Sequence, residues 1–210
     1  MVATKVSALG DATLTDDDLG YTADAGNPKK FSMAQLRTLL AGKGILNLDI
    51  TALRKIAAND IDTAANHGGI LSSDGADVTL ARVNGATDKA LVVNWPLGVV
   101  TEVQFPVVPM PMDLDEAVDV TLHFIFDMSG AADTPTVDVQ VFDGVGDVEM
   151  GSATAALSAS EQELTVTIAN ADITGNPLGR FNVSLIPGAH GTDAIRLRAA
   201  WGEYTKKAAT

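Results

Sequence analysis

The chain has 210 residues and a formal net charge of −13; 46% of its residues are hydrophobic but only 5% are aromatic. Because it contains no cysteine, the sequence excludes disulfides, thiolate metal sites and a cysteine nucleophile. Between Lys89 and Arg180 there is no Lys or Arg, although Asp and Glu are frequent there. Such a surface repels phosphate groups, so we expect no nucleic-acid partner and no anionic membrane partner.

The amino-terminal residues 1 to 30 carry mainly turn and loop signals. They lack the apolar run of a signal peptide, and no run of about 18 apolar residues follows that could span a bilayer. We therefore expect a soluble protein made in the cytoplasm. Within this segment, "LGYTAD" and "PKKFS" predict a small hairpin around "DAGNP".

The stretch "KKFSMAQLRTLLAG" predicts a short helix that begins after Ser32 and ends before Gly42. Ser32 is the N-cap, Gln35 completes a capping box, and Phe31 is placed as a hydrophobic staple. A helix of fewer than three turns is marginal in water, so it needs an apolar surface to lie on. The residues that would make this contact recur at helical spacing: Met33, Leu36, Leu39 and Leu40.

A second helix is predicted by "LDITALRKIAANDIDTAANHGG", with Asp49 as its N-cap and a stop at Gly68 and Gly69. Its apolar residues form a narrow seam: Ile50, Leu53, Ala57, Ile61 and Ala64. This seam either packs on the β domain of its own chain or contacts a neighbour. Alternatively, three copies meet about an axis as a short coiled coil.

From residue 78 onward the apolar pattern has a period of two, which is typical of half-buried strands. In "AVDVTLHFIFDM" the inward positions are Val118, Val120, Leu122, Phe124 and Phe126. In "AIRLRAAWGEY" they are Ile195, Leu197, Ala199 and Trp201. About eight such strands, separated by turn signals, predict an antiparallel jelly-roll-like β-sandwich. An immunoglobulin-like sandwich is the runner-up, although its Cys and Trp landmarks are absent.

The predicted organisation is therefore mainly β, with the sandwich preceded by an amino-terminal arm that carries two short helices. We assign residues 1–44 to a docking arm, 45–75 to the second helix and a linker, and 76–210 to the sandwich.

The segment "FPVVPMPMDLDEA" contains three prolines, which favour an extended path over a regular central strand. One interpretation is a crossover between the two sheets. The other is an apolar strip offered to a neighbouring subunit. That strip would consist of Val107, Val108, Met110 and Met112.

A search for reactive groups finds no motif for catalysis, and we expect neither an enzyme nor a bound cofactor. His123 shares the polar face of its strand with Asp119 and Thr121, but no spacing supplies a further metal ligand. His190 has Asp193 nearby, and Ser184 or Ser158 could complete a triad, yet no nucleophile elbow is present. The acidic runs "TDDD" and "DLDEA" lack the pattern of an EF-hand loop.

The order of a polar lead, "GYTAD", "KKFSMAQLRTLL" and a β domain resembles bacteriophage virion proteins, in which a lysine-rich turn and a "QL" helix recur at the amino termini of tail and head fibres. The later "NGATDKALVVNW", "EVQFP" and "AAWGEYTKK" are similar to proteins encoded among phage structural genes. The resemblance implies a capsid decoration (cement) or head-fibre protein at the capsid surface of a virion. It also implies a homotrimer whose partner is the major capsid protein.

The resemblance assigns capsid docking to the amino-terminal region, and the residues expected to dock are Tyr21, Phe31, Met33, Leu36, Leu39 and Leu40. The expected subunit interface comprises the seam residues Ile50, Leu53, Ala57 and Ile61 together with the proline-rich strip.

The alternative function is that of a tail receptor-binding or carbohydrate-binding protein. Sandwich domains bind sugars through exposed aromatic side chains, and this chain has few of these. Trp201 is expected in the core because it follows the inward alternation of its strand, whereas Trp95, before Pro96, is the candidate for exposure.

Overall fold

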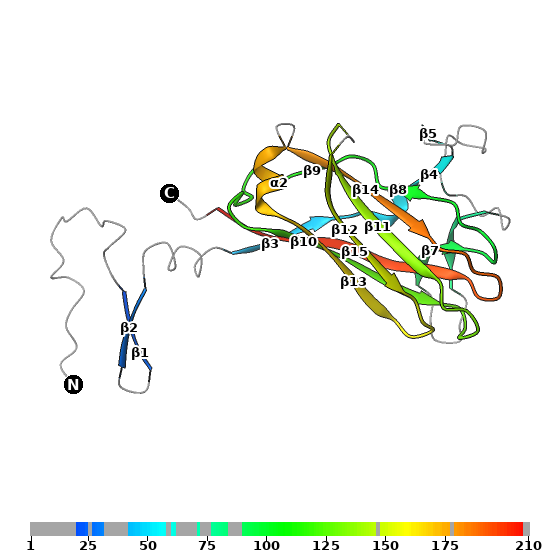
Figure 1. Cartoon of the computed structure of the whole chain (residues 1–210), viewed down its shortest axis with the longest axis horizontal. Coiled ribbons are helices and arrows are strands. Elements are labelled where there is room, and N and C mark those ends of the chain that lie inside the picture. Colours follow the sequence, from blue (N-terminus) through cyan, green and yellow to red (C-terminus); the bar gives the residue numbers. More distant parts are fainter. Residues whose placement is uncertain are drawn as a thin grey trace. The chain divides into compact units, whose positions relative to one another are not determined.

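A computed structural model gives the fold of the chain (Figure 1). The residues that it describes are 20–24, 27–31, 42–57, 60–61, 71, 77–83, 90–145, 148–176 and 179–207. Contacts divide the chain into one unit of Met1–Gly42 with Lys207–Thr210 and another of Lys43–Lys206.

The first unit contains a hairpin of β1 (Gly20–Asp24) and β2 (Asn27–Phe31), paired antiparallel. This confirms the hairpin predicted around "DAGNP". Tyr21 and Phe31, two of the expected docking residues, lie in it. The predicted helix from Ser32 to Leu40 lies outside the described residues, and so do Met33, Leu36, Leu39 and Leu40.

The second unit is an antiparallel β-sandwich, as the sequence predicted. The first sheet has the order β13 (Gln162–Ile168), β10 (Val120–Met128), β15 (Ile195–Thr205), β7 (Leu91–Trp95) and β6 (Thr79–Arg82), with β3 (Lys43–Asn47) also paired to β15. The second sheet has the order β12 (Glu149–Ala156), β11 (Thr136–Asp143), β14 (Arg180–Pro187), β8 (Val103–Gln104), β4 (Arg54–Ala57) and β5 (Asp60–Ile61), with β9 (Val108–Pro109) paired to β14.

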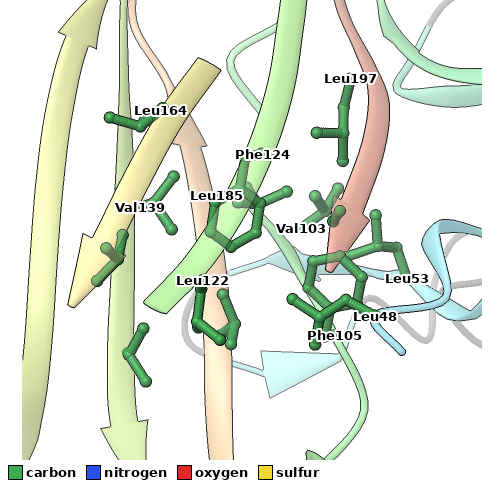
Figure 2. Packing of buried hydrophobic residues seen from close by; sticks show 14 of the residues in the cluster. Leu48, Leu53, Val103, Phe105, Leu122, Phe124, Val139, Leu164, Leu185 and Leu197 are labelled. Atoms are coloured by element: carbon green, nitrogen blue, oxygen red, sulfur yellow. The ribbon is translucent and has the colours of Figure 1, made fainter. Parts of the chain in front are cut away.

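The inward faces of the two sheets share one core (Figure 2). In β10 the predicted alternation is confirmed, since Val120, Leu122, Phe124 and Phe126 are buried. Branched side chains from β11 and β14 of the second sheet face them, and those of β13 lie beside them in the first sheet. Among the described residues, Phe105 is the aromatic ring paired with Phe124, at a centroid distance of 6.4 Å. Small and branched side chains therefore fill the core of this aromatic-poor chain.

The prediction of a second helix is wrong over residues 50–57 and 60–61, while Ala64 and the rest of the predicted helix lie outside the described residues. Its first residues form a single 3-10 turn, η2 (Ile50–Ala52), where Asp49 is the N-cap and accepts a hydrogen bond from the Thr51 amide. The chain then extends into β4, which pairs with β8, and into β5. Helical spacing in the sequence is overridden because strand pairing satisfies the backbone while Leu48 and Leu53 reach the core from an extended path.

The described residues of the predicted seam therefore do not form one face of a helix. Leu53 is fully buried and Ile50 packs against the same core, so both residues contact their own sandwich. Ala57 and Ile61 lie in β4 and β5.

Strand β3 was not predicted, and two further elements, strand β12 and a short helix, were not predicted either. Strand β12 has the sequence "EMGSATAA", in which Met150 is the one large apolar residue and the one buried residue. The short helix α2 (Asn170–Gly175) replaces the end of a predicted strand, and its Ile173 enters the core. Both elements gain apolar surface from neighbouring segments rather than from a pattern of their own.

Strand β3 is held on β15 by an aromatic side chain. Tyr204 lies opposite Gly44, and its ring occupies the space that a side chain at position 44 would take. The Tyr204 hydroxyl donates to Oδ1 of Asp113 at 2.9 Å, and Lys206 lies 3.5 Å from the same carboxylate. A glycine is thus required where β3 joins the sheet.

We expect Gly44→Val to lower the free energy of unfolding by about 1–3 kcal/mol, because the added side chain must displace the Tyr204 ring. Urea unfolding of the purified protein measures this loss. Ile45→Val is the matched control, since Ile45 is 63% exposed on the same strand. Equal stability of the two variants would contradict the role of Gly44.

The hydrogen bond from Tyr204, followed by the charge of Lys206, holds the pKa of Asp113 below its ordinary value of 3.8. A lowered folded-state pKa stabilises the protein above the unfolded value and loses this contribution as the pH falls through the folded-state pKa. We therefore expect Asp113→Asn to be less stable than the parent at neutral pH and to approach it as the pH falls through the folded-state pKa of Asp113. Urea midpoints measured from pH 7 to pH 2 test this, and a constant difference between the proteins would refute it.

Candidate functional site

A one-residue slip in β15 determines which side chains face outward on the first sheet. Ile125 of β10 pairs with Ala199, but the next residue, Phe126, pairs with Leu197. Arg198 is therefore an extra residue, a β-bulge, and it reverses the inward and outward positions beyond it. Consequently Ala200 is buried, and Trp201 faces outward and is only half-buried.

Both tryptophan predictions are thus wrong, and in opposite directions. Trp95 is fully buried, with its indole nitrogen donating to the carbonyl of Thr101 at 2.8 Å. The loop after β7 folds back over the end of the strand and supplies this acceptor. Trp201 was expected inside because uninterrupted alternation from Ile195 would place it there, and the bulge interrupts that alternation.

Trp201 belongs to a row of outward side chains that crosses adjacent strands of the first sheet. Cross-strand partners lie on the same face of a sheet, so the register alone brings them together. We call this row and its two acidic neighbours, Glu163 and Glu203, the Trp201 face. In order from β13 through β10 and β15 to β3, the row is Thr165, His123, Trp201 and Asn47.

The rings of His123 and Trp201 are stacked, with centroids 4.9 Å apart and planes inclined by 3°. Nδ1 of His123 lies 2.6 Å from Oε1 of Glu163, which can only accept, so this nitrogen donates. The imidazole is therefore held at its edge by the Glu163 carboxylate and stacks with one face on the indole, which limits the rotation of Trp201. Because it covers one face of Trp201, the other indole face points away from β10, toward the side where β3 carries exposed Asn47.

A buried charge cluster holds β15 just before the bulge. The Asp127 carboxylate, whose side chain is 4% exposed, accepts hydrogen bonds of 2.8 Å from both Arg196 and Arg198. Arg196 also donates to the Met128 carbonyl, and Arg198 lies 3.0 Å from Glu161. These charge-assisted bonds link β15 to β10 and to the start of β13, which makes the base of the Trp201 face rigid.

Neither arrangement considered for chemistry is assembled. His190 places Nδ1 3.0 Å from the Gly188 carbonyl and Nε2 2.9 Å from the Pro96 carbonyl, whereas Asp193 accepts from the amides of Ala132 and Asp133. No cluster of three or more His, Asp or Glu side chains suited to a metal ion occurs in the part of the chain that the structure describes. Asp119, expected beside His123, instead accepts from the Asn170 amide.

The proline-rich segment is divided between the core and the surface. Val108 is buried and Met110 packs against the core, while Val107 is 48% and Met112 100% exposed. The segment first runs along the second sheet, where β9 pairs with the start of β14, and then leads to β10 of the first sheet, as expected for a crossover between the sheets. Only Val107 and Met112 of the proposed strip present large apolar surface.

No protein-family model and no curated protein matches the sequence. The xylan-binding module CBM15 is similar in structure, with a TM-score of 0.51 and 16% identity over 80% of this chain and 100% of that one. TmCBM61, solved with β-1,4-galactotriose, aligns over 76% of this chain and 86% of its own at a TM-score of 0.39 and 12% identity. A CBM36-1 domain of a multidomain xylanase from the hindgut metagenome of Trinervitermes trinervoides aligns over 77% of this chain and 96% of its own. Its TM-score is 0.40 and its sequence identity is 10%.

The likeness to CBM15 supports the β-sandwich fold of this chain. Among the described helices, none is both long and apolar enough to cross a bilayer.

The different exposure of the two tryptophans can be measured by fluorescence. We expect Trp201→Phe, which leaves Trp95 as the remaining tryptophan, to shift the emission maximum to shorter wavelength and to reduce quenching by acrylamide. Thermal unfolding should show that the variant is folded. Undiminished quenching in this variant would mean that Trp95, not Trp201, is the exposed residue.

Proposed function

We propose that the chain binds glycans through the Trp201 face of its β-sandwich. The observation that carries this proposal is the outward, stacked position of Trp201 beside His123. A tryptophan held rigidly on a sheet face loses little conformational entropy when a ligand packs against it.

The side chains around Trp201 match the chemistry of a sugar ring. A pyranose has a face of C–H groups that packs on an indole and a rim of hydroxyls that both donate and accept hydrogen bonds. Beside the open indole face, exposed Asn47 supplies an amide with both functions. Thr165 supplies a hydroxyl, and Glu163 and Glu203 supply acceptors.

The charge of this face favours a neutral glycan. Glu163 is 47% exposed, and the guanidinium groups of Arg196 and Arg198 are already engaged by Asp127. Because Glu163 and Glu203 carry negative charge on this face, an anionic sugar would meet repulsion here. The fold that the chain shares with CBM15 supports glycan binding as a class and leaves the identity of the sugar to experiment.

Attachment to a capsid through residues 1–44 stays a prediction based on the resemblance to virion proteins. It is compatible with glycan binding, because the arm and the sandwich would then have separate tasks, attachment and recognition. The homotrimer and the major capsid protein as partner likewise stay predictions.

A glycan array probed with the full chain tests the proposed function, followed by titration of the best neutral ligand. We expect Trp201→Ala to weaken binding about tenfold or more, because contact with a large aromatic ring contributes on the order of 1.5–3 kcal/mol. Trp201→Phe should retain part of the affinity. Met112→Ala is the control, since Met112 is fully exposed and lies outside the Trp201 face. Absence of any glycan ligand, or unchanged affinity in Trp201→Ala, would contradict the proposal.

A further inference from the structure

The second sheet carries a different row of outward side chains, which is polar across its whole width. Its members come from β12, β11, β14, β8 and β4, and the register places them side by side. In that order they are Ser152, Gln140, Ser184, Gln104 and Arg54. Hydroxyls and amides thus lead to a single guanidinium at one end of the row.

At this end lies a cavity of about 290 Å³, which we call the Arg54 cleft. Arg54, Gln104 and Asn182 contribute its polar groups. Ile56, Pro106 and Val107 form an apolar wall. An apolar wall facing a few converging polar groups is the usual composition of a small-molecule site, and this volume is close to the lower limit of about 300 Å³ for such sites.

Arg54 is positioned by its own backbone and keeps one edge available. Its Nη1 donates to the carbonyls of Ala52 at 2.8 Å and Leu53 at 3.1 Å, which fixes the guanidinium plane. Within the described residues, Nε and Nη2 make no hydrogen bond or ion pair. Among the described residues that line the cleft, none carries a carboxylate. Outside the lining, Glu102 lies beside Ile56, whose amide donates to the Glu102 carbonyl at 2.9 Å, and Asp138 is bonded to Gln140 and Thr154.

The amides of the cleft also have free capacity. Asn182 donates through Nδ2 to the Asp143 carbonyl at 2.8 Å, so its Oδ1 is held as an acceptor. Gln104, opposite both Arg54 and Ser184, can donate and accept. These groups suit the hydroxyls of a ligand, while the Pro106 and Val107 wall suits the C–H face of a ring.

We propose that the Arg54 cleft binds a saccharide unit that carries a carboxylate, that is, a uronic acid. The planar Nε and Nη2 edge of a guanidinium matches a carboxylate with two parallel hydrogen bonds. The charge preference is opposite to that of the Trp201 face, so the two sites would recognise different parts of a mixed glycan or different glycans. This second site does not rest on the function proposed for Trp201.

The test uses the full chain in calorimetric titrations with trigalacturonic and triglucuronic acid, their methyl esters, and acetate. We expect at least one of the two acids to bind, and its methyl ester, which keeps the sugar rings but carries a methyl group in place of each negative charge, to bind at least tenfold more weakly. Acetate alone should bind far more weakly than the acid. Affinity for the acid should also fall as salt is raised from about 50 to 500 mM.

Variants locate the site. Arg54→Gln should weaken binding of the acid about tenfold or more, and Gln104→Ala should weaken it less, because Gln104 forms only neutral hydrogen bonds. Arg180→Gln is the matched control, since Arg180 is an exposed arginine on β14 that does not line the cleft. Circular dichroism establishes that each variant is folded. Trp201→Ala should leave uronate binding unchanged.

Several results would overturn the inference. Failure of both acids to bind, or equal affinity for acid and ester, would exclude recognition of a carboxylate. Equal affinity for acetate and the acid would exclude recognition of the sugar. Equal effects of Arg54→Gln and Arg180→Gln would mean that the acid is attracted by positive charge in general and is not bound in the cleft. Loss of uronate binding in Trp201→Ala would place the ligand on the other sheet, while loss of neutral glycan binding alone would affect only the Trp201 proposal.

Discussion

The position of one extra residue in β15 governs the outward chemistry of the first sheet. Before Arg198 the strand is in one phase, fixed by the bonds from Arg196 and Arg198 to buried Asp127. After it the phase is fixed from the inside, because Gly202 is the inward residue where a β-carbon would lie 2.9 Å from a Leu122 methyl group. The two phases can coexist only with a bulge between them. The outward position of Trp201 follows from this packing constraint.

Glycine and tyrosine extend the same constraint to β3. Tyr204 lies inward, two residues after Gly202, and covers Gly44, so β3 is held in the register that places Asn47 opposite Trp201. The Trp201 face therefore depends on interactions on the opposite side of the sheet from its own side chains. The Asp127 charge cluster, the stacked rings and the glycine contacts all depend on the same register of β15 with its neighbouring strands.

The two sheets present different chemistry although they share one core. The first offers an aromatic face flanked by carboxylates, and the second offers a cleft with one guanidinium and neutral amides. In a chain that has no Lys or Arg between Lys89 and Arg180, the positive group of the cleft comes from β4, a segment that the sequence assigned to a helix. If the arm attaches the protein to a virion, as the resemblance implies, both glycan sites proposed here would belong to the recognising part.

The sequence by itself determined the sandwich, because period-two alternation in strands such as β10 reflects burial of one face and requires no knowledge of partners. It also determined the β1–β2 hairpin, which turn residues specify locally. Only the tertiary structure decided that residues 50–57 and 60–61 form a turn and strands, since β8 supplies the partner for β4. It alone decided the phase of Trp201 as well. The adjacent Ala199 and Ala200 suit either face, so the slip is set by cross-strand contacts that lie far away in the sequence.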